Sequence, residues 1–205
     1  MSDEKTAAPV SGRTGWGRFL LAFLPAAVVA ALLVGLVGQG GLAASLAVSG
    51  HRFKVSADVL EGKGFAQYGD VVTTSGGERH PVAMSVIDDA TLTNLCQSVL
   101  MDTPVGKVTF LVQAGQGGKP VRVRNMVIDL AQLDGDAEFT NLQIGRDAAT
   151  LENATGSTGR RGGFGQQSDT VRITRLRQTA YAVNAGTFTL TGLTMTLRRG
   201  AHECF

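Results

Sequence analysis

Alternation of apolar and polar residues dominates the chain after residue 50 and predicts β-strands. In FTNLQIG (139–145) the alternation slips: beyond Asn141, the apolar residues Leu142 and Ile144 have the opposite parity to Phe139. A strand that keeps period two on both sides of one extra residue is typical of a β-bulge or a sharp bend. We therefore predict that the strand bends at Asn141.

The same slip recurs along the chain and predicts a set of bends. Asn and Gly occupy most of the slip positions, and both tolerate the positive φ that a bulge can require, whereas Arg does so less readily. The predicted strand-bend positions are Asn94, Asn125, Asn141, Arg175 and Gly192.

Two segments, 121–146 and 171–198, share one layout. Each has a turn-forming sequence between two slips, LDGD at 133–136 and VNAG at 183–186, and Asp-Gly between alternating segments is a strong hairpin signal. We predict a mainly β domain with two long bent antiparallel hairpins related by duplication. Curled hairpins can form a sandwich or an open trough with an apolar inner face, and the pattern leaves both open. Residues 88–102 fit a strand or a helix, and the LTNL slip favours the strand.

The first fifty residues have a different pattern. No charged residue occurs from Phe19 to Gly50, and residues 19–37 are almost purely apolar. As a helix they would span about 28 Å, close to the hydrocarbon thickness of a bilayer. We predict a cytoplasmic tail (1–18), a transmembrane or signal helix (19–38), a linker (39–50) and an extracytoplasmic β domain (51–205) with a flexible loop at 152–169, where Gly and polar residues prevail.

Positive charge predicts the orientation of that helix. Arg13 and Arg18 precede the apolar run, and the next basic residue is Arg52, so the amino end is expected in the cytoplasm. The chain would then be a single-pass membrane protein with its carboxyl-terminal domain outside, or a secreted protein if cleaved near Ala43. The run exceeds the usual signal core of about 7 to 15 residues, which favours the anchor.

The balance of charges argues against a nucleic acid partner, and the cysteines predict a disulfide. Residues 51–205 hold sixteen of the nineteen Lys and Arg and fifteen of the seventeen Asp and Glu, so we expect no nucleic acid partner. An even pair of cysteines outside the cell predicts a disulfide between Cys96 and Cys204. A metal or reactive thiol at His202 and Cys204 is the alternative, although further ligands are not evident.

Candidate chemistry is sparse. The three histidines, His51, His80 and His202, read as loop or terminal residues, and no Gly-x-Ser-x-Gly sequence accompanies them. A carboxylate set at Asp134, Asp136 and Glu138 could bind Ca²⁺, but a turn also favours Asp. The Gly-rich runs lack the spacing of phosphate-binding loops. We predict neither a cofactor nor a metal, and the residues favour a non-enzymatic protein.

Seven stretches carry a resemblance to a known family. They are GRTGWGRF, LAASLAVSGHRFKVSADVLEGKGFAQYG, LTNLCQSV, DLAQLDGDAEFTNLQIGRDA, GGFGQQSD, GTFTLTGLTMTLRRG and the terminal HECF. These stretches resemble an uncharacterised family of Streptomyces and related actinobacteria. The resemblance implies export and a cell-envelope setting, and some members carry the label cholesterol esterase. It supplies no catalytic residues.

Three functions follow as expectations. The first is an envelope protein whose β domain binds lipid or another envelope component. The second is a structural or partner-binding ectodomain that contacts another envelope protein. The third, an esterase, depends on the family label alone.

Overall fold

The computed structural model describes residues 50–205, which belong to a compact unit formed by 47–205. This part of the chain is built from β-strands and one short 3-10 helix, so the prediction of a mainly β domain is confirmed. The elements are β1 (Phe53–Thr73), β2 (Arg79–Thr93), β3 (Leu95–Thr103), β4 (Gly106–Ala114), β5 (Val121–Thr140), β6 (Gln143–Asp147), η1 (Ala148–Thr150), β7 (Phe164–Thr189) and β8 (Thr194–Arg199).

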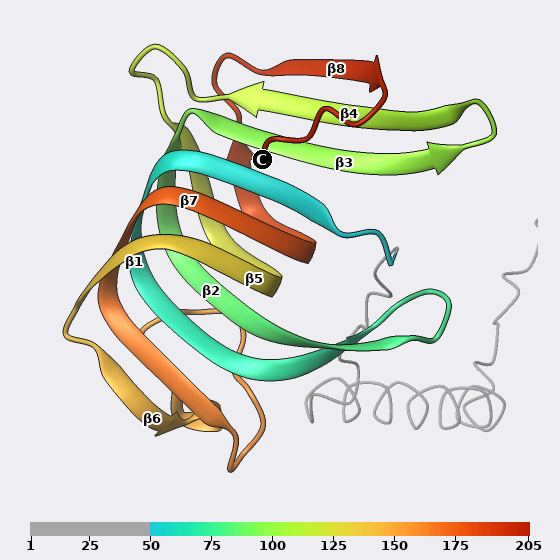
Figure 1. The fold of residues 1–205 in the computed structure, drawn as a ribbon. Coiled ribbons are helices and arrows are strands. Elements are labelled where there is room, and N and C mark those ends of the chain that lie inside the picture. Colours follow the sequence, from blue (N-terminus) through green and yellow to red (C-terminus); the bar gives the residue numbers. More distant parts are fainter. Residues whose placement is uncertain (1–49) are drawn as a thin grey trace, which may run out of the picture. The chain divides into compact units, whose positions relative to one another are not determined.

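The strands form one antiparallel sheet that closes on itself. The order is β6-β7-β5-β2-β1-β3-β4-β8, and an additional pairing joins β7 to β1. The four long strands β1, β2, β5 and β7 therefore make a ring, which curves strongly in Figure 1, while β3, β4 and β8 extend from it as a flatter layer. The main apolar core lies inside the ring and reaches β3 and β4 through Leu95 and Ala114.

A first row of bends crosses the sheet where β2 passes into β3. Asn94 has φ 51° and Arg175 has φ 53°, and both lie beside Asp58 of β1. The Asn94 side-chain amide donates a hydrogen bond to the Asp58 carboxylate. Neighbouring strands thus bend at one level, which lets a wide sheet curl without breaking its ladders.

A second row crosses the same strands further along. Asn125 (φ 49°) lies opposite Asp88, and Gly64 (φ 66°) lies between Asp88 and Asp169. Asn141 (φ 54°) donates from its amide to the Asp169 carboxylate at 2.6 Å. In this row too, residues with left-handed backbone alternate with aspartates on the adjacent strands. The slip in FTNLQIG marks one end of the row.

All five predicted bend positions have positive φ, but their places differ. Asn125 and Arg175 lie within β5 and β7, whereas Asn94 and Asn141 separate successive strands. Gly192, with φ 69°, lies in the turn between β7 and β8.

The two predicted hairpins, 121–146 and 171–198, are wrong. Strand β5 continues through 133–136 and β7 through 183–186, and the two strands pair with each other from Arg122↔Thr189 to Thr140↔Thr170. Each strand therefore finds its hydrogen-bond partner far away in sequence. The hairpins that form join β1 to β2 and β3 to β4.

Asp134-Gly135 serves a bulge instead of a turn. The register of β5 on β7 shifts between Asp134 and Asp136, and Gly135 there has φ 153°. A Cβ at Gly135 would lie 2.8 Å from the Ile173 Cγ2 atom and 2.9 Å from the Thr174 carbonyl oxygen. Glycine is needed at this position because the two strands approach so closely. The local sequence Asp-Gly fits such a bulge as well as a hairpin turn, so it does not distinguish the two.

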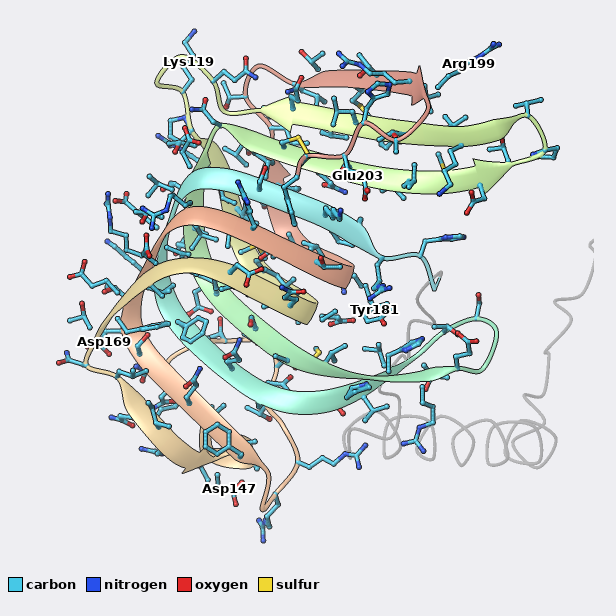
Figure 2. All side chains as sticks on the ribbon, viewed as in Figure 1. Lys119, Asp147, Asp169, Tyr181, Arg199 and Glu203 are labelled. Atoms are coloured by element: carbon cyan, nitrogen blue, oxygen red, sulfur yellow. A yellow bond between two sulfur atoms is a disulfide. The ribbon has the colours of Figure 1, made fainter. Side chains whose placement is uncertain are left out.

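The predicted disulfide between Cys96 and Cys204 is confirmed. It fastens the carboxyl-terminal segment, in which Glu203 is labelled in Figure 2, to β3. The Cys204 amide also donates to the Ser98 hydroxyl at 3.1 Å, and the Lys54 ammonium lies 3.2 Å from the Glu203 carboxylate.

The segment predicted as a flexible loop, 152–169, is divided between a loop and a strand, because β7 begins at Phe164. The loop part is tied to the sheet: the Thr155 amide and hydroxyl both donate to the Asp88 carboxylate, at 2.6 and 2.8 Å. Buried Gln167 accepts from the Glu152 amide at 2.8 Å. Its mobility stays a prediction.

The predicted tail, membrane or signal helix and most of the linker (1–49) lie outside the described residues. Within 50–205 no helix is long and apolar enough to cross a membrane.

The left-handed backbone at Asn125 gives a first testable prediction. The Asn125 side chain is exposed, so a substitution there tests the backbone with little change in packing. We expect Asn125→Val to lower the free energy of unfolding by about 1 to 2 kcal/mol, because a β-branched residue is strained at positive φ. Asn125→Gly should change it by less than about 1 kcal/mol. Urea unfolding followed by circular dichroism compares the two, and equal values would contradict a bend at this residue.

Candidate functional site: an apolar cavity

A cavity of about 480 Å³ lies between the ring and the β3-β4-β8 layer. Its size falls within the range of about 300 to 1,000 Å³ that is usual for small-molecule sites. Strands β1, β2, β3, β4, β5, β7 and β8 all supply residues to its walls, because inward-facing residues alternate with outward-facing ones along a strand. The lining side chains are Phe53, Val55, Leu60, Leu92, Leu95, Gln97, Val112, Met126, Ile128, Gln178, Val183, Ala185, Phe188, Leu190, Leu193 and Met195.

Exposed apolar side chains form the rim of this cavity. Phe188 is 40% exposed, Leu193 45% and Met195 55%, and all three also line the cavity. Leu197, two residues further along the edge strand β8, is 68% exposed. Large apolar side chains gathered at an opening mark a surface that a ligand or partner covers.

A second cavity of about 230 Å³ continues the first one into the ring. The two share Leu60, Ile128 and Gln178 as wall residues. The inner cavity is mostly apolar, with Phe65 and Phe139 in contact across it at a ring-centroid distance of 5.4 Å. It also has a polar side where the Gln67 amide donates to the Ser85 hydroxyl at 2.7 Å. The inner cavity therefore has polar groups on one side of a mostly apolar wall.

Charge is missing from both cavity walls. In the part of the chain that the structure describes, no Asp, Glu, Lys, Arg or His lines either cavity. A charged group placed there would be desolvated without a counter-charge, which is strongly unfavourable. The walls therefore suit an uncharged, largely apolar molecule.

His80 and His202 line neither cavity. The His80 ring stacks on Tyr181 at 4.8 Å and lies 3.5 Å from the Glu78 carboxylate. The His202 ring contacts the Arg199 carbonyl oxygen at 3.0 Å. The structure gives neither of these two rings a serine hydroxyl as partner, so neither is arranged to activate a serine nucleophile.

The carboxylates considered for Ca²⁺ lie along β5, opposite arginines of β7. Asp134 pairs across the strands with Arg177, and Glu138 with Arg172. The Asp136 carboxylate forms an ion pair with Arg175. Among the described residues no group of three or more His, Cys, Asp or Glu is placed to hold a metal ion. Opposite charge on the neighbouring strand accounts for these residues as cross-strand pairs.

A polar cluster on the outer face of the ring is separate from the cavity. Burial raises the pKa of the Asp129 carboxyl, and the nearby Asp70 carboxylate raises it further. Burial also raises the pKa of the Tyr68 phenol, whose oxygen is hydrogen-bonded to the Ser157 hydroxyl.

At the far end of the sheet, the Ala149 and Gly162 amides donate to the Asp147 carboxylate and lower its pKa. These hydrogen bonds cap η1 and hold the loop that follows it.

The residues singled out from the sequence form the scaffold of the site. Asn94, Asn125, Asn141 and Arg175 lie where the sheet bends, and the disulfide fastens the carboxyl-terminal segment to β3, a strand of the layer that lines the cavity. The cavity residues themselves were missed. Gln178 and Gln97 are polar residues at inward positions of otherwise apolar strands, which is a detectable signal only once the strand pairing is known.

Of the comparisons with known proteins, the one with family models gives a match. No curated protein and no solved structure matches the chain. One family model matches residues 49–205, which is most of the chain and covers the whole described domain. The chain therefore belongs to a family of unknown function, DUF6230.

Proposed function

We propose that this protein is a cell-envelope lipid-binding protein, without enzymatic activity, that holds an apolar chain in the cavity between the ring and the β3-β4-β8 layer. The observation that carries the proposal is the cavity of about 480 Å³ with an almost wholly apolar wall and an exposed apolar rim. Burial of apolar ligand surface is favourable by roughly 25 cal/mol per Å².

The predicted anchor, if retained, would keep the domain near a source of lipid. Phe53, the first residue of β1, lines the cavity, so the chain enters the domain next to the ligand site. The predicted linker of residues 39–50 reaches at most about 40 Å when extended. A domain tethered in this way would stay close to the outer surface of the membrane, where single-chain lipids are available.

Native mass spectrometry tests the proposal. Residues 47–205 form a compact unit with its own core and disulfide, so they can be produced alone. Exported from an actinobacterial host and purified without detergent, this domain should carry a stoichiometric lipid that solvent extraction removes. The extracted lipid can then be identified by its fragmentation.

A domain purified without bound lipid would be the opposite result. A mass equal to that of the polypeptide alone, together with no uptake of lipid from added vesicles of extracted membrane lipid, would contradict lipid binding. The rim formed by Phe188, Leu193 and Met195 would then be examined as a contact for another envelope protein by crosslinking in the full-length chain.

A further inference from the structure

Gln178 is a polar side chain without a polar partner in the wall of both cavities. It is 4% exposed, and it lies where the two cavities meet. Among the described residues, the Gln178 amide forms no side-chain hydrogen bond, and no fully buried side-chain N or O atom lacks a partner, so this amide keeps accessible surface toward the cavities that it lines. A ligand that fills the cavity would remove water from the amide, which costs about 1 to 3 kcal/mol unless the ligand supplies a hydrogen bond in return.

The strand pairing explains where this amide points. Gln178 of β7 and Gln97 of β3 are both cross-strand partners of Val55 in β1. Partners in a ladder share a face of the sheet, so both glutamines face inward with Val55. Two amides thus flank one valine in a wall that is otherwise apolar, and Gln178 is the deeper of the two.

We propose that Gln178 binds an uncharged polar group of the lipid, so that the ligand is an apolar chain bearing a hydroxyl, carbonyl or ester at its buried part. This inference rests on the proposed function and specifies its ligand. An amide both donates and accepts, which suits any of these groups. An ionised group is disfavoured because neither cavity wall carries a counter-charge.

Competition binding with two matched probes tests the assignment. Dodecan-1-ol and dodecane are each used to displace N-phenyl-1-naphthylamine from residues 47–205. We expect Gln178→Leu to weaken the binding of dodecan-1-ol about threefold to tenfold, which corresponds to the loss of one neutral hydrogen bond. The affinity for dodecane should change less than twofold. For each probe, the dissociation constant of the variant is divided by that of the parent. This ratio cancels the difference in hydration between the two probes.

Two further variants keep the test decisive. Gln178→Met replaces the amide with an unbranched apolar side chain of similar length and should repeat the result if Gln178→Leu alters packing. Gln132→Leu, at an exposed position of β5, should leave both probes unchanged. The proposed role of Gln178 is wrong if both variants weaken the binding of the two probes by the same factor, or if both variants leave the binding of the two probes unchanged. Lipid binding by the cavity would stand in either case. If neither probe displaces the fluorophore from the parent protein, lipid binding itself fails.

Discussion

Replacing both cysteines with alanine should lower the free energy of unfolding by about 4 to 5 kcal/mol. The bond between Cys96 and Cys204 closes a loop with a sequence separation of 108, and the chain-entropy model assigns roughly that value to a loop of this length. Because a domain of this size has a total stability of about 5 to 15 kcal/mol, the double variant should be near the limit of folding at 37 °C. Urea unfolding of residues 47–205, followed by circular dichroism, measures the difference.

Two comparisons separate the covalent link from the contacts around it. The parent domain unfolded and refolded in reductant should match the double variant. Lys54→Ala keeps the disulfide but removes the ion pair with Glu203 and the 3.0 Å hydrogen bond to the Phe205 carbonyl, and it should cost about 1 kcal/mol or less. A loss below about 1 kcal/mol in the double variant would show that noncovalent contacts alone hold the carboxyl-terminal segment.

Local sequence signals predicted the features that depend on local geometry. Period-two alternation identified the strands, and its slips identified positions such as Asn125 and Arg175, where the backbone has positive φ. The cysteine pair could be predicted because only one intramolecular pairing is available to two cysteines. These inferences need no knowledge of which strand lies beside which.

Pairing of distant strands is what the sequence did not reveal. Asp134-Gly135 has the composition of a hairpin turn, yet β5 and β7 pair on both sides of it, from Arg122 to Thr140, with register shifts that include the one between Asp134 and Asp136. The cavity depends on the same long-range pairing. Gln178 and Gln97 become neighbours of one valine only after β3, β1 and β7 are aligned.

The rows of bends connect the fold with the proposed site. A flat sheet of this width would leave no enclosed space, whereas strands that bend together at Asn94 and Arg175, and again at Asn125 and Asn141, wrap the apolar face inward. The aspartates between these residues stabilise the bends, as Asp58 does for Asn94 and Asp169 for Asn141. The curvature that the slips predict is thus a condition for the cavity.

Filling the cavity should abolish most lipid binding. Ala185 lines the cavity from β7, yet its side chain is exposed, so a larger residue there can enter the cavity without displacing the core. We expect Ala185→Trp to weaken dodecan-1-ol binding about tenfold to a hundredfold, because overfilling an apolar site typically costs 1 to 3 kcal/mol. The expected change in the free energy of unfolding is small.

Asn184→Trp is the matched control for this variant. Asn184 is adjacent on the same strand, also exposed, and directed to the opposite face. The indole of Asn184→Trp should therefore lie outside the cavity and leave binding within about twofold of the parent. Residues 47–205 contain no tryptophan, since the single one of the chain is Trp16, so each introduced indole reports its own surroundings. A blue-shifted emission from Ala185→Trp combined with undiminished binding would show that the lipid occupies another place, whereas a blue shift with lost binding assigns the ligand to this cavity.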